Sequence, residues 1–223
     1  WMFRTHLRRV GAHAAACAGV TGVLLMGFVY ADQLTTWAED RFYGDSVMLR
    51  ETSLYQRVVV TANQSGVRLF LNGNLQFNSR DEYRYHEALV HPAMAAQGAP
   101  KTVLILGGGD GMAAREVLKY ESVEQLTLVD LDAKVTQLFS QQPRLTALNG
   151  NALNSPKLKI INADAFVWLE THQAQFDIII VDFPDPSNFS LGKLYTTSFY
   201  ELIDQHLAAS GYAVVQTTSP LLA

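Results

Sequence analysis

The sequence has a single cysteine, Cys17, among 223 residues, and it has no long block of basic residues. One cysteine forms neither an intramolecular disulfide nor a CxxC zinc site, which excludes a disulfide-stapled domain and a zinc-ribbon module. Lysine and arginine number 17 against 21 acidic residues, a formal net charge of −4, so the charge does not favour a nucleic-acid partner. With 48% hydrophobic and 17% charged residues, the chain is predicted to be one folded domain of ordinary size, alone or with an appendage.

Acidic residues are also missing from the first 31 positions, which carry Arg4, Arg8 and Arg9. The formal charge of this segment is therefore +3, whereas residues 32–223 have a formal charge of −7. Residues 10–31 contain no Asp, Glu, Lys or Arg. About 20 apolar residues span a bilayer as a helix, so residues 1–31 are predicted to form a transmembrane or targeting helix. Two alternatives stay open: a cleaved signal peptide ending near Ala31, and an alanine-rich helix buried in a soluble protein.

The orientation of this helix is also open. Arginines before it and acids after it favour a cytoplasmic N-terminus and export of the residues that follow. Because the chain begins with Trp1 rather than Met, we expect it to be a piece of a longer protein, in which preceding helices would change this count.

A small β domain with an exit helix is predicted over residues 54–98, after a connecting helix or loop at 32–53. Its strands are expected where β-branched and aromatic residues are dense, and Asn72-Gly73 is typical of a tight turn between two of them. The strands expected are residues 55–61, 67–71 and 75–77.

The exit helix is predicted from a capping signal. Ser79 and Glu82 have the spacing of a capping box, which favours a helix from Asp81 to about Pro92.

Residues 99–223 alternate between short apolar runs and helical segments. This pattern is typical of an α/β fold with a Rossmann-like, doubly wound parallel sheet, the class that methyltransferases also use. The expected strands are 103–106, 126–129, 158–161, 178–181 and 212–216, and the expected helices are 112–120, 133–139, 165–170 and 197–207.

A glycine cluster follows the first of these strands: Gly107, Gly108, Gly109 and Gly111, with Asp110 among them. Glycines there let a ligand approach the backbone at the carboxyl ends of the strands. The cluster alone is a weak signal, because a tight turn in any α/β domain would look the same.

Carboxylates follow the later strands and strengthen the prediction. Asp130 ends the second strand at a spacing suited to ribose hydroxyls, Asp164 follows the third, and Asp182 and Asp185 follow the fourth. Any one of them could cap a helix, Asp164 above all. Together they repel one another, and a cationic ligand is the simplest compensation.

These motifs resemble the polyamine aminopropyltransferases, that is, spermidine synthase and its relatives. The resemblance covers residues 50–218 and rests on motifs in the expected order. They are GGGDG at 107–111, VDLD at 129–132, NADA at 162–165, VDFPDP at 181–186, YQ at 55–56, LNGNLQ at 71–76, DEYRYHE at 81–87, LY at 194–195 and FY at 199–200.

The resemblance implies decarboxylated S-adenosylmethionine as co-substrate, a diamine such as putrescine as acceptor, and no bound cofactor. It implies that Asp182 is the catalytic base. Substrate-binding roles fall to Asp130 (ribose), Asp164 (adenine), Asp110 (aminopropyl ammonium), Gln56 and Gln76 (nucleoside and aminopropyl region), Asp185 (acceptor), Tyr85 and Tyr195 (attacking amine) and His86 (pocket).

Other expectations concern metals, partners and location. No metal site is expected, because His86 and His91 are five residues apart and do not share a helix face as HExxH ligands do. We expect small-molecule substrates, a homo-oligomer and no nucleic acid. Since the implied co-substrate is made in the cytoplasm, we expect a catalytic domain on the cytoplasmic side of an inner or plasma membrane, against the positive-inside count.

The sequence departs from the family pattern in three places. Met112 stands where a second glycine is usual, and Phe183-Pro184 stand between the two acids where small and hydroxyl residues are usual. The sequence also stops at Ala223, just past the fifth strand, so we expect it to lack part of the acceptor pocket. Two rival functions remain: a methyltransferase that uses intact S-adenosylmethionine, whose carboxylate the acids would repel, and a membrane-tethered protein that binds polyamine or nucleoside without turnover.

Overall fold

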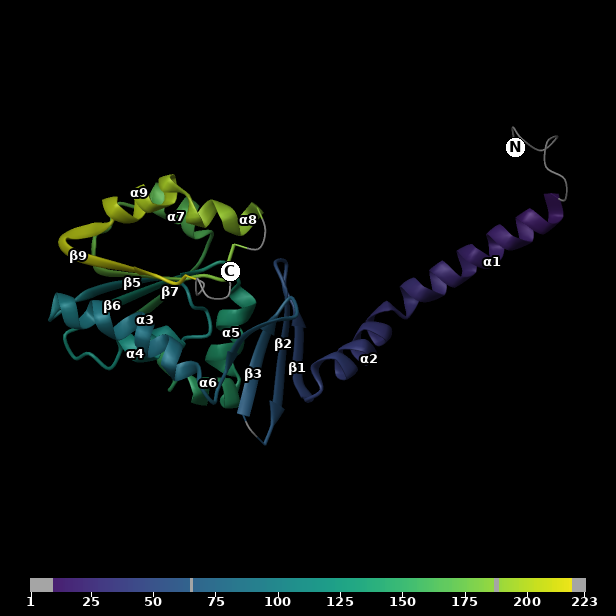
Figure 1. Cartoon of the computed structure of the whole chain (residues 1–223), viewed down its shortest axis with the longest axis horizontal. Coiled ribbons are helices and arrows are strands. Elements are labelled where there is room, and N and C mark those ends of the chain that lie inside the picture. The colour runs from purple at the N-terminus through teal and green to yellow at the C-terminus, as the bar shows by residue number, and fades with distance from the viewer. Residues whose placement is uncertain (1–9, 65, 187–188, 218–223) are drawn as a thin grey trace. The chain divides into compact units, whose positions relative to one another are not determined.

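The computed structural model describes residues 10–64, 66–186 and 189–217 (Figure 1). The chain divides into two compact units, Trp1–Val47 and Met48–Ala223. Arg4, Arg8 and Arg9, on which the positive charge of the N-terminal segment depends, lie outside the described residues.

The first unit is helical. Helix α1 (Val10–Val29) has no buried side chain and is, in the described part of the chain, the one helix long and apolar enough to cross a membrane by length and composition. Helix α2 (Ala31–Tyr43) follows and ends at Gly44, whose φ of 65° is the left-handed conformation that glycine adopts without a Cβ clash.

A four-stranded sheet begins the second unit. Its strands lie in the order β1-β2-β3-β4, and the turn after β3 uses positive φ at Asn72 (50°) and Gly73 (82°), as its sequence predicted. Residues 32–53, expected to be a connecting helix or loop, also contain the strand β1. Its side chains show no clear alternation of apolar and polar residues, but they are half-buried and the strand pairs with its neighbour β2. The strands are β1 (Ser46–Thr52), β2 (Arg57–Asn63), β3 (Gly66–Leu71) and β4 (Asn74–Asn78).

Helix α3 (Glu82–Gln97) leaves this sheet, but the expected capping box does not form. Ser79 Oγ instead accepts a hydrogen bond from the backbone N–H of Val67 at 2.9 Å, which joins the end of β4 to β3. The helix also continues past Pro92, its expected end, to bury Ala93 and Met94. Packing of these side chains outweighs the backbone hydrogen bond that proline cannot donate.

The second sheet is parallel and has the strand order β7-β6-β5-β8-β9. This confirms the doubly wound α/β prediction. The chain reverses direction across the sheet between β5 and β8, the switch point where such folds bind ligands. The strands are β5 (Thr102–Gly107), β6 (Gln125–Asp130), β7 (Leu158–Asn162), β8 (Phe176–Asp182) and β9 (Leu207–Val215).

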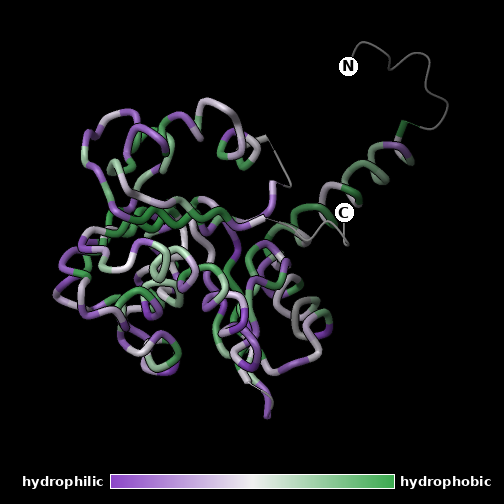
Figure 2. Tube along the Cα trace, turned by 60° about the vertical axis from the view of Figure 1, so that its left-hand side comes forward, coloured by the Kyte–Doolittle hydropathy of each residue, from purple (hydrophilic) through white to green (hydrophobic). Residues whose placement is uncertain are grey.

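Helices cover both faces of this sheet (Figure 1), and its central strands are largely hydrophobic (Figure 2). The side chains of these strands alternate between two cores. Val103 and Ile105 pack toward α3, α4 and the small sheet, whereas Leu104 and Leu106 pack toward α7 and α9. The central strands are therefore apolar on both faces, as buried parallel strands require. The helices are α4 (Met112–Val117), α5 (Ala133–Gln141), α6 (Pro143–Leu148), α7 (Ala165–Thr171), α8 (Phe189–Gly192) and α9 (Thr197–Gln205).

Candidate active site

The glycine loop after β5 lies against the end of β8. A Cβ on Gly107 would stand 2.2 Å from the backbone oxygen of Asp182, and one on Gly108 would stand 3.0 Å from its Oδ2. Both glycines also have positive φ, 85° and 65°. Only glycine therefore lets the loop lie this close to Asp182.

Asp130, at the end of β6, is partly buried behind the same loop. Its Oδ2 accepts from the N–H of Gly109 at 3.0 Å, and its Oδ1 accepts from the N–H of Asp132 at 2.8 Å. Burial raises the pKa of Asp130 to about 6 despite these hydrogen bonds. A Cβ on Gly109 would stand 2.7 Å from Oδ2, so the close approach of loop and carboxylate again requires glycine.

Asp182 ends β8 at the switch point, where Tyr85 of α3 donates a hydrogen bond from its hydroxyl to Oδ1 at 2.5 Å. Burial and, second, the nearby charge of Asp110 raise the pKa of Asp182, while His86 and Tyr85 oppose the rise, and the net value is about 6. Burial and the Asp182 charge also raise the pKa of the Tyr85 hydroxyl, which stays a donor. A strongly shifted carboxyl at a switch point marks a functional site.

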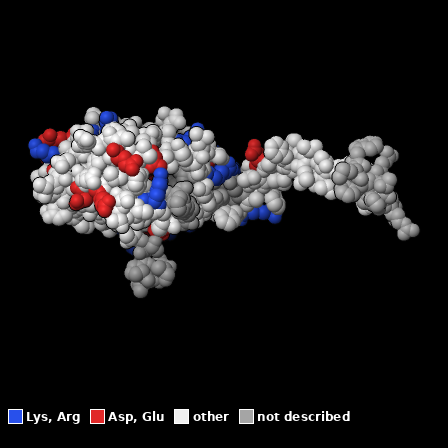
Figure 3. All heavy atoms as spheres, turned by 90° about the horizontal axis from the view of Figure 1, so that it is seen from above, with Lys and Arg blue, Asp and Glu red and all other residues white. Residues whose placement is uncertain are grey.

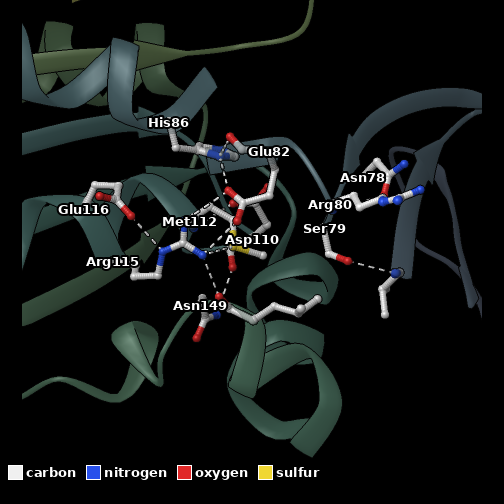
Figure 4. A network of polar contacts seen from close by, with 12 residues as sticks. Asn78, Ser79, Arg80, Glu82, His86, Asp110, Met112, Arg115, Glu116 and Asn149 are labelled. Carbon is white, nitrogen blue, oxygen red and sulfur yellow. Dashed lines mark hydrogen bonds and ion pairs between the residues drawn. The ribbon is translucent and has the colours of Figure 1, made fainter. Parts of the chain in front are cut away.

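Asp110 lies in the glycine loop and is held from two sides (Figure 4). Its Oδ1 accepts from the N–H of Met112 at 2.9 Å, and its backbone oxygen accepts from Asn149 Nδ2 at 2.9 Å. Asn149 is fully buried and also donates to the backbone oxygen of Phe139 at 3.1 Å. No local motif marks Asn149, so its sequence context does not predict this role.

His86 is buried one helical turn after Glu82 on α3. Its Nδ1 lies 2.7 Å from Glu82 Oε2. Burial lowers the pKa of His86, but the hydrogen bond to Glu82 and the charges of Asp110 and Asp182 outweigh burial, and the net pKa is raised. The charge state of His86 is therefore coupled to those of Asp110 and Asp182.

Asp164 has the capping role that the sequence left open as an alternative. Its Oδ1 accepts from the N–H groups of Phe166 at 3.0 Å and Val167 at 3.4 Å, at the start of α7. Its Oδ2 pairs with the ammonium of Lys193. Burial raises the pKa of Asp164, but Lys193 and the capping hydrogen bonds outweigh burial, and the net pKa is lowered.

Tyr195 and Asp185 lie beyond β8, beside the end of β9. The Tyr195 hydroxyl donates to the backbone oxygen of Pro184 at 3.0 Å, and Gln216 Nε2 donates to Asp185 Oδ1 at 3.2 Å. Burial, followed by the charge of Asp185, raises the pKa of Tyr195 to about 12. Gln216 joins this group through the pairing of β8 with β9, which no local sequence signal indicates.

The two glutamines of the small sheet differ in position. Gln56 Nε2 donates to Asp132 Oδ2 at 2.9 Å, and Ser53 Oγ donates to the same oxygen at 2.7 Å, so Gln56 lies beside the end of β6. Gln76 is exposed on β4 and donates locally to the backbone oxygen of Asn74 at 3.3 Å.

Charges elsewhere do not form a second acidic centre in the described part of the chain. On the face seen in Figure 3, acidic and basic side chains are scattered among uncharged ones. Glu87, His91 and Glu116 bring ligand-type atoms within 4.8 Å of one another. However, Glu116 is already neutralised by Arg115 at 2.9 Å and Lys119 at 2.5 Å, so we interpret this group as an ion-pair network.

Comparison with known proteins supports one family. Residues 82–223 match the model of the spermine/spermidine synthase domain. The whole chain is 51% identical to polyamine aminopropyltransferase 2 of Ralstonia nicotianae and 48% identical to polyamine aminopropyltransferase of Leptospira interrogans. It spans 44% and 45% of the length of these two relatives.

Solved structures agree with this match. A crystal structure of spermidine synthase in complex with the transition-state analogue AdoDATO superimposes with a TM-score of 0.73 at 32% identity, over 78% of this chain and 59% of that chain. Spermidine synthase from Thermotoga maritima gives a TM-score of 0.71, also at 32% identity, over 78% of this chain and 58% of that chain. With a family model that covers more than half of its residues, the chain belongs to the spermine/spermidine synthase family.

Proposed function

We propose that the protein transfers the aminopropyl group of decarboxylated S-adenosylmethionine to a diamine such as putrescine, giving spermidine and methylthioadenosine. The observation that carries the proposal is the pair of carboxylates Asp110 and Asp182 at the switch point, the second of which is partly buried and bound by Tyr85. Both substrates are cations, which compensate the repulsion between these acids.

The nucleoside would lie along the ends of β5, β6 and β7. Asp130 and the glycine loop would hold the ribose, Asp164 the adenine, and Asp110 the aminopropyl ammonium. In the structure Asp164 is paired with Lys193, so binding adenine there requires that this contact open or rearrange. Gln56, through its contact with Asp132, would support the nucleoside side, and Gln76 would contact substrate in place of its local hydrogen bond to Asn74.

The acceptor would lie between Asp182, Asp185, Tyr85 and Tyr195, with His86 lining the pocket. A primary alkyl ammonium has a pKa near 10.4, as lysine has, so removing its proton at pH 7 costs about 4 to 5 kcal/mol. The raised pKa of Asp182 makes it a stronger base than an ordinary aspartate by about two units, or roughly 3 kcal/mol.

Asp182 therefore accepts a proton from the bound ammonium, and this frees the nitrogen lone pair for attack. A nitrogen–carbon bond forms at the propyl carbon next to sulfur, the carbon–sulfur bond breaks, and its electron pair leaves with neutral methylthioadenosine. Positioning the amine in line with the leaving sulfur supplies the remaining acceleration.

The test is to incubate the full-length protein with decarboxylated S-adenosylmethionine and a panel of amines, and to detect products by mass spectrometry. We expect methylthioadenosine and an aminopropylated amine, and we expect Asp182→Asn to lower the rate by a factor of about 100 or more. Asp204→Asn, an exposed acid on α9, is the matched control. Methylated product would favour the methyltransferase alternative, binding without turnover the non-catalytic one, and a near-normal rate in Asp182→Asn would refute its role as base.

We also propose that the protein is a membrane-located homo-oligomer whose catalytic domain faces the cytoplasm. In this proposal residues 1–31 form a transmembrane helix and 32–53 a linker. Residues 54–98 form the small β domain, and 99–223 form the nucleoside-binding domain. Helix α1 supports this, because its 20 residues rise by about 30 Å, the thickness of the hydrocarbon core. A fusion of residues 1–47 to a soluble reporter should stay in the membrane pellet after alkaline carbonate. Release of the intact fusion would contradict a membrane span, and a product cut after Ala31 would indicate a signal peptide.

A further inference from the structure

Glu82, the first residue of α3, has a role that its capping-box spacing did not predict. Its carboxylate lies toward α4, where Arg115 binds it through two parallel contacts: one guanidinium nitrogen lies 3.0 Å from Oε1 and the other 3.1 Å from Oε2 (Figure 4). The Glu82 side chain is only 8% exposed. Such a bidentate contact fixes both the position and the plane of the carboxylate.

Arg115 is itself held in place. Its Nε donates to Glu116 Oε1 at 2.9 Å, and one terminal nitrogen donates to the backbone oxygen of Leu148 at 2.7 Å. Glu116 is 1% exposed, so the guanidinium has a buried anchor on each side. The clamp on Glu82 is therefore rigid.

The Glu82 carboxylate held by Arg115 also contacts His86. Glu82 Oε2 lies 2.7 Å from His86 Nδ1, and the His86 side chain is 3% exposed. A carboxylate at this distance places a proton on Nδ1 and fixes the orientation of the ring. The ring of Tyr85 packs edge-on against the imidazole at 4.8 Å between centroids, and the same tyrosine donates to Asp182.

We propose that Glu82 and Arg115 are positioning residues that fix His86 with its Nδ1–H toward Glu82 and keep the imidazole positively charged beside Asp110 and Asp182. The inference rests on the proposed function and extends it, since neither Glu82 nor Arg115 would touch substrate. Its consequence is electrostatic: the positive imidazole holds Asp182 in the ionised form that accepts a proton.

The charges around His86 fix the sign of the effect. Glu82 on its own helix, Asp110 in the glycine loop and Asp182 on β8 all favour the protonated imidazole, and only burial opposes it. His86 in turn lowers the pKa of Asp182. Removing the carboxylate of Glu82 should therefore lower the pKa of His86, so that the imidazole becomes neutral at a lower pH. Without the positive imidazole beside it, Asp182 should keep its proton up to a higher pH.

The first experiment measures kcat/KM against pH for the full-length protein and its variants. For Glu82→Gln we expect the acid limb to move up by about one pH unit, which lowers activity at pH 6 by roughly 5- to 10-fold and at pH 8 by less than about 2-fold. Arg115→Met should shift the limb in the same direction and Arg115→Lys less, because lysine keeps the charge but loses the bidentate contact. Glu201→Gln, an exposed acid on α9 away from this network, should leave the limb unchanged.

A second variant separates positioning from simple structural damage. In a His86→Asn background, Glu82→Gln should produce no further shift, because the effect acts through the imidazole. An equal loss of activity at every pH, or a shift that persists without His86, would overturn the inference.

Histidine NMR supplies a readout that does not depend on turnover. The titration midpoint of His86 should fall in Glu82→Gln relative to the unsubstituted protein, and an unchanged midpoint would overturn the inference. If the unsubstituted protein transfers no aminopropyl group, the proposed function fails, while this titration still decides whether Glu82 controls His86.

Discussion

Replacing the partly buried carboxylate of Asp182 by an amide should stabilise the protein while it removes activity. The pKa of Asp182 is raised from an ordinary 3.8 to about 6. A difference of roughly two units means that ionised Asp182 costs the folded state about 3 kcal/mol relative to the unfolded chain. In Asp182→Asn the amide oxygen can still accept from Tyr85, so the hydrogen bond at 2.5 Å need not be lost.

Desolvation of the amide offsets part of this gain, and we expect a net stabilisation of about 2 kcal/mol at pH 7.5. For a domain of this size, that corresponds to a rise in Tm of roughly 4 to 8 °C. The folded state binds the Asp182 proton more tightly than the unfolded chain does. The cost of the carboxylate is therefore absent below about pH 4, grows between about pH 4 and 6, and is complete above that range.

The assay is thermal unfolding of the unsubstituted protein and of Asp182→Asn from pH 4 to 8, with Asp204→Asn as a control for the loss of one negative charge. We expect the difference in Tm to be small at pH 4 and to reach its full value above pH 6 for Asp182→Asn alone. A variant that is equally stable at pH 7.5, or whose stability advantage does not depend on pH, would refute the argument that burial destabilises this carboxylate.

Three further substitutions test other parts of the site and core. Gly109→Ala places a Cβ 2.7 Å from the carboxylate of Asp130 and should weaken methylthioadenosine binding by about 10-fold or more in calorimetry, whereas Gly192→Ala, with open space around its Cβ, should not. Asn149→Ala removes this donor from the backbone oxygen of Asp110 and leaves that of Phe139 with only the Thr146 hydroxyl, and should cost about 1 to 3 kcal/mol in urea unfolding; a loss below about 0.5 kcal/mol would contradict this. Phe199→Ala empties a fully buried position and should cost about 3 to 5 kcal/mol, and an unchanged unfolding midpoint would contradict that packing.

The elements that the sequence predicted well are those whose signal is local. The five apolar runs of 99–223 form five parallel strands, because strands covered on both faces need side chains that are apolar throughout. The Asn72-Gly73 turn follows from the positive φ that both residues adopt. By contrast, β1 was missed, since its residues are stabilised by pairing with a strand that the segment itself does not specify.

The same distinction holds for the site. The positions of Asp110, Asp130, Asp164 and Asp182 follow from strand ends alone, because the carboxyl ends of parallel strands meet at one edge of a sheet. Their chemical states do not. Asp130 and Asp182 have raised pKa values because the fold partly buries them, while the pKa of Asp164 is lowered because Lys193 reaches it from a later turn.

What the sequence alone determined is thus the alternation of strands and helices over residues 99–223, the glycine loop and the edge of the sheet that carries the acids. Only the tertiary structure decided that Glu82 turns away from its cap to Arg115 and His86, and that Asn149 holds Asp110. Gln56 likewise reaches Asp132 across 76 residues of sequence. Turns and strands depend on neighbouring residues along the chain, whereas these contacts and pKa shifts depend on side chains that packing alone brings together.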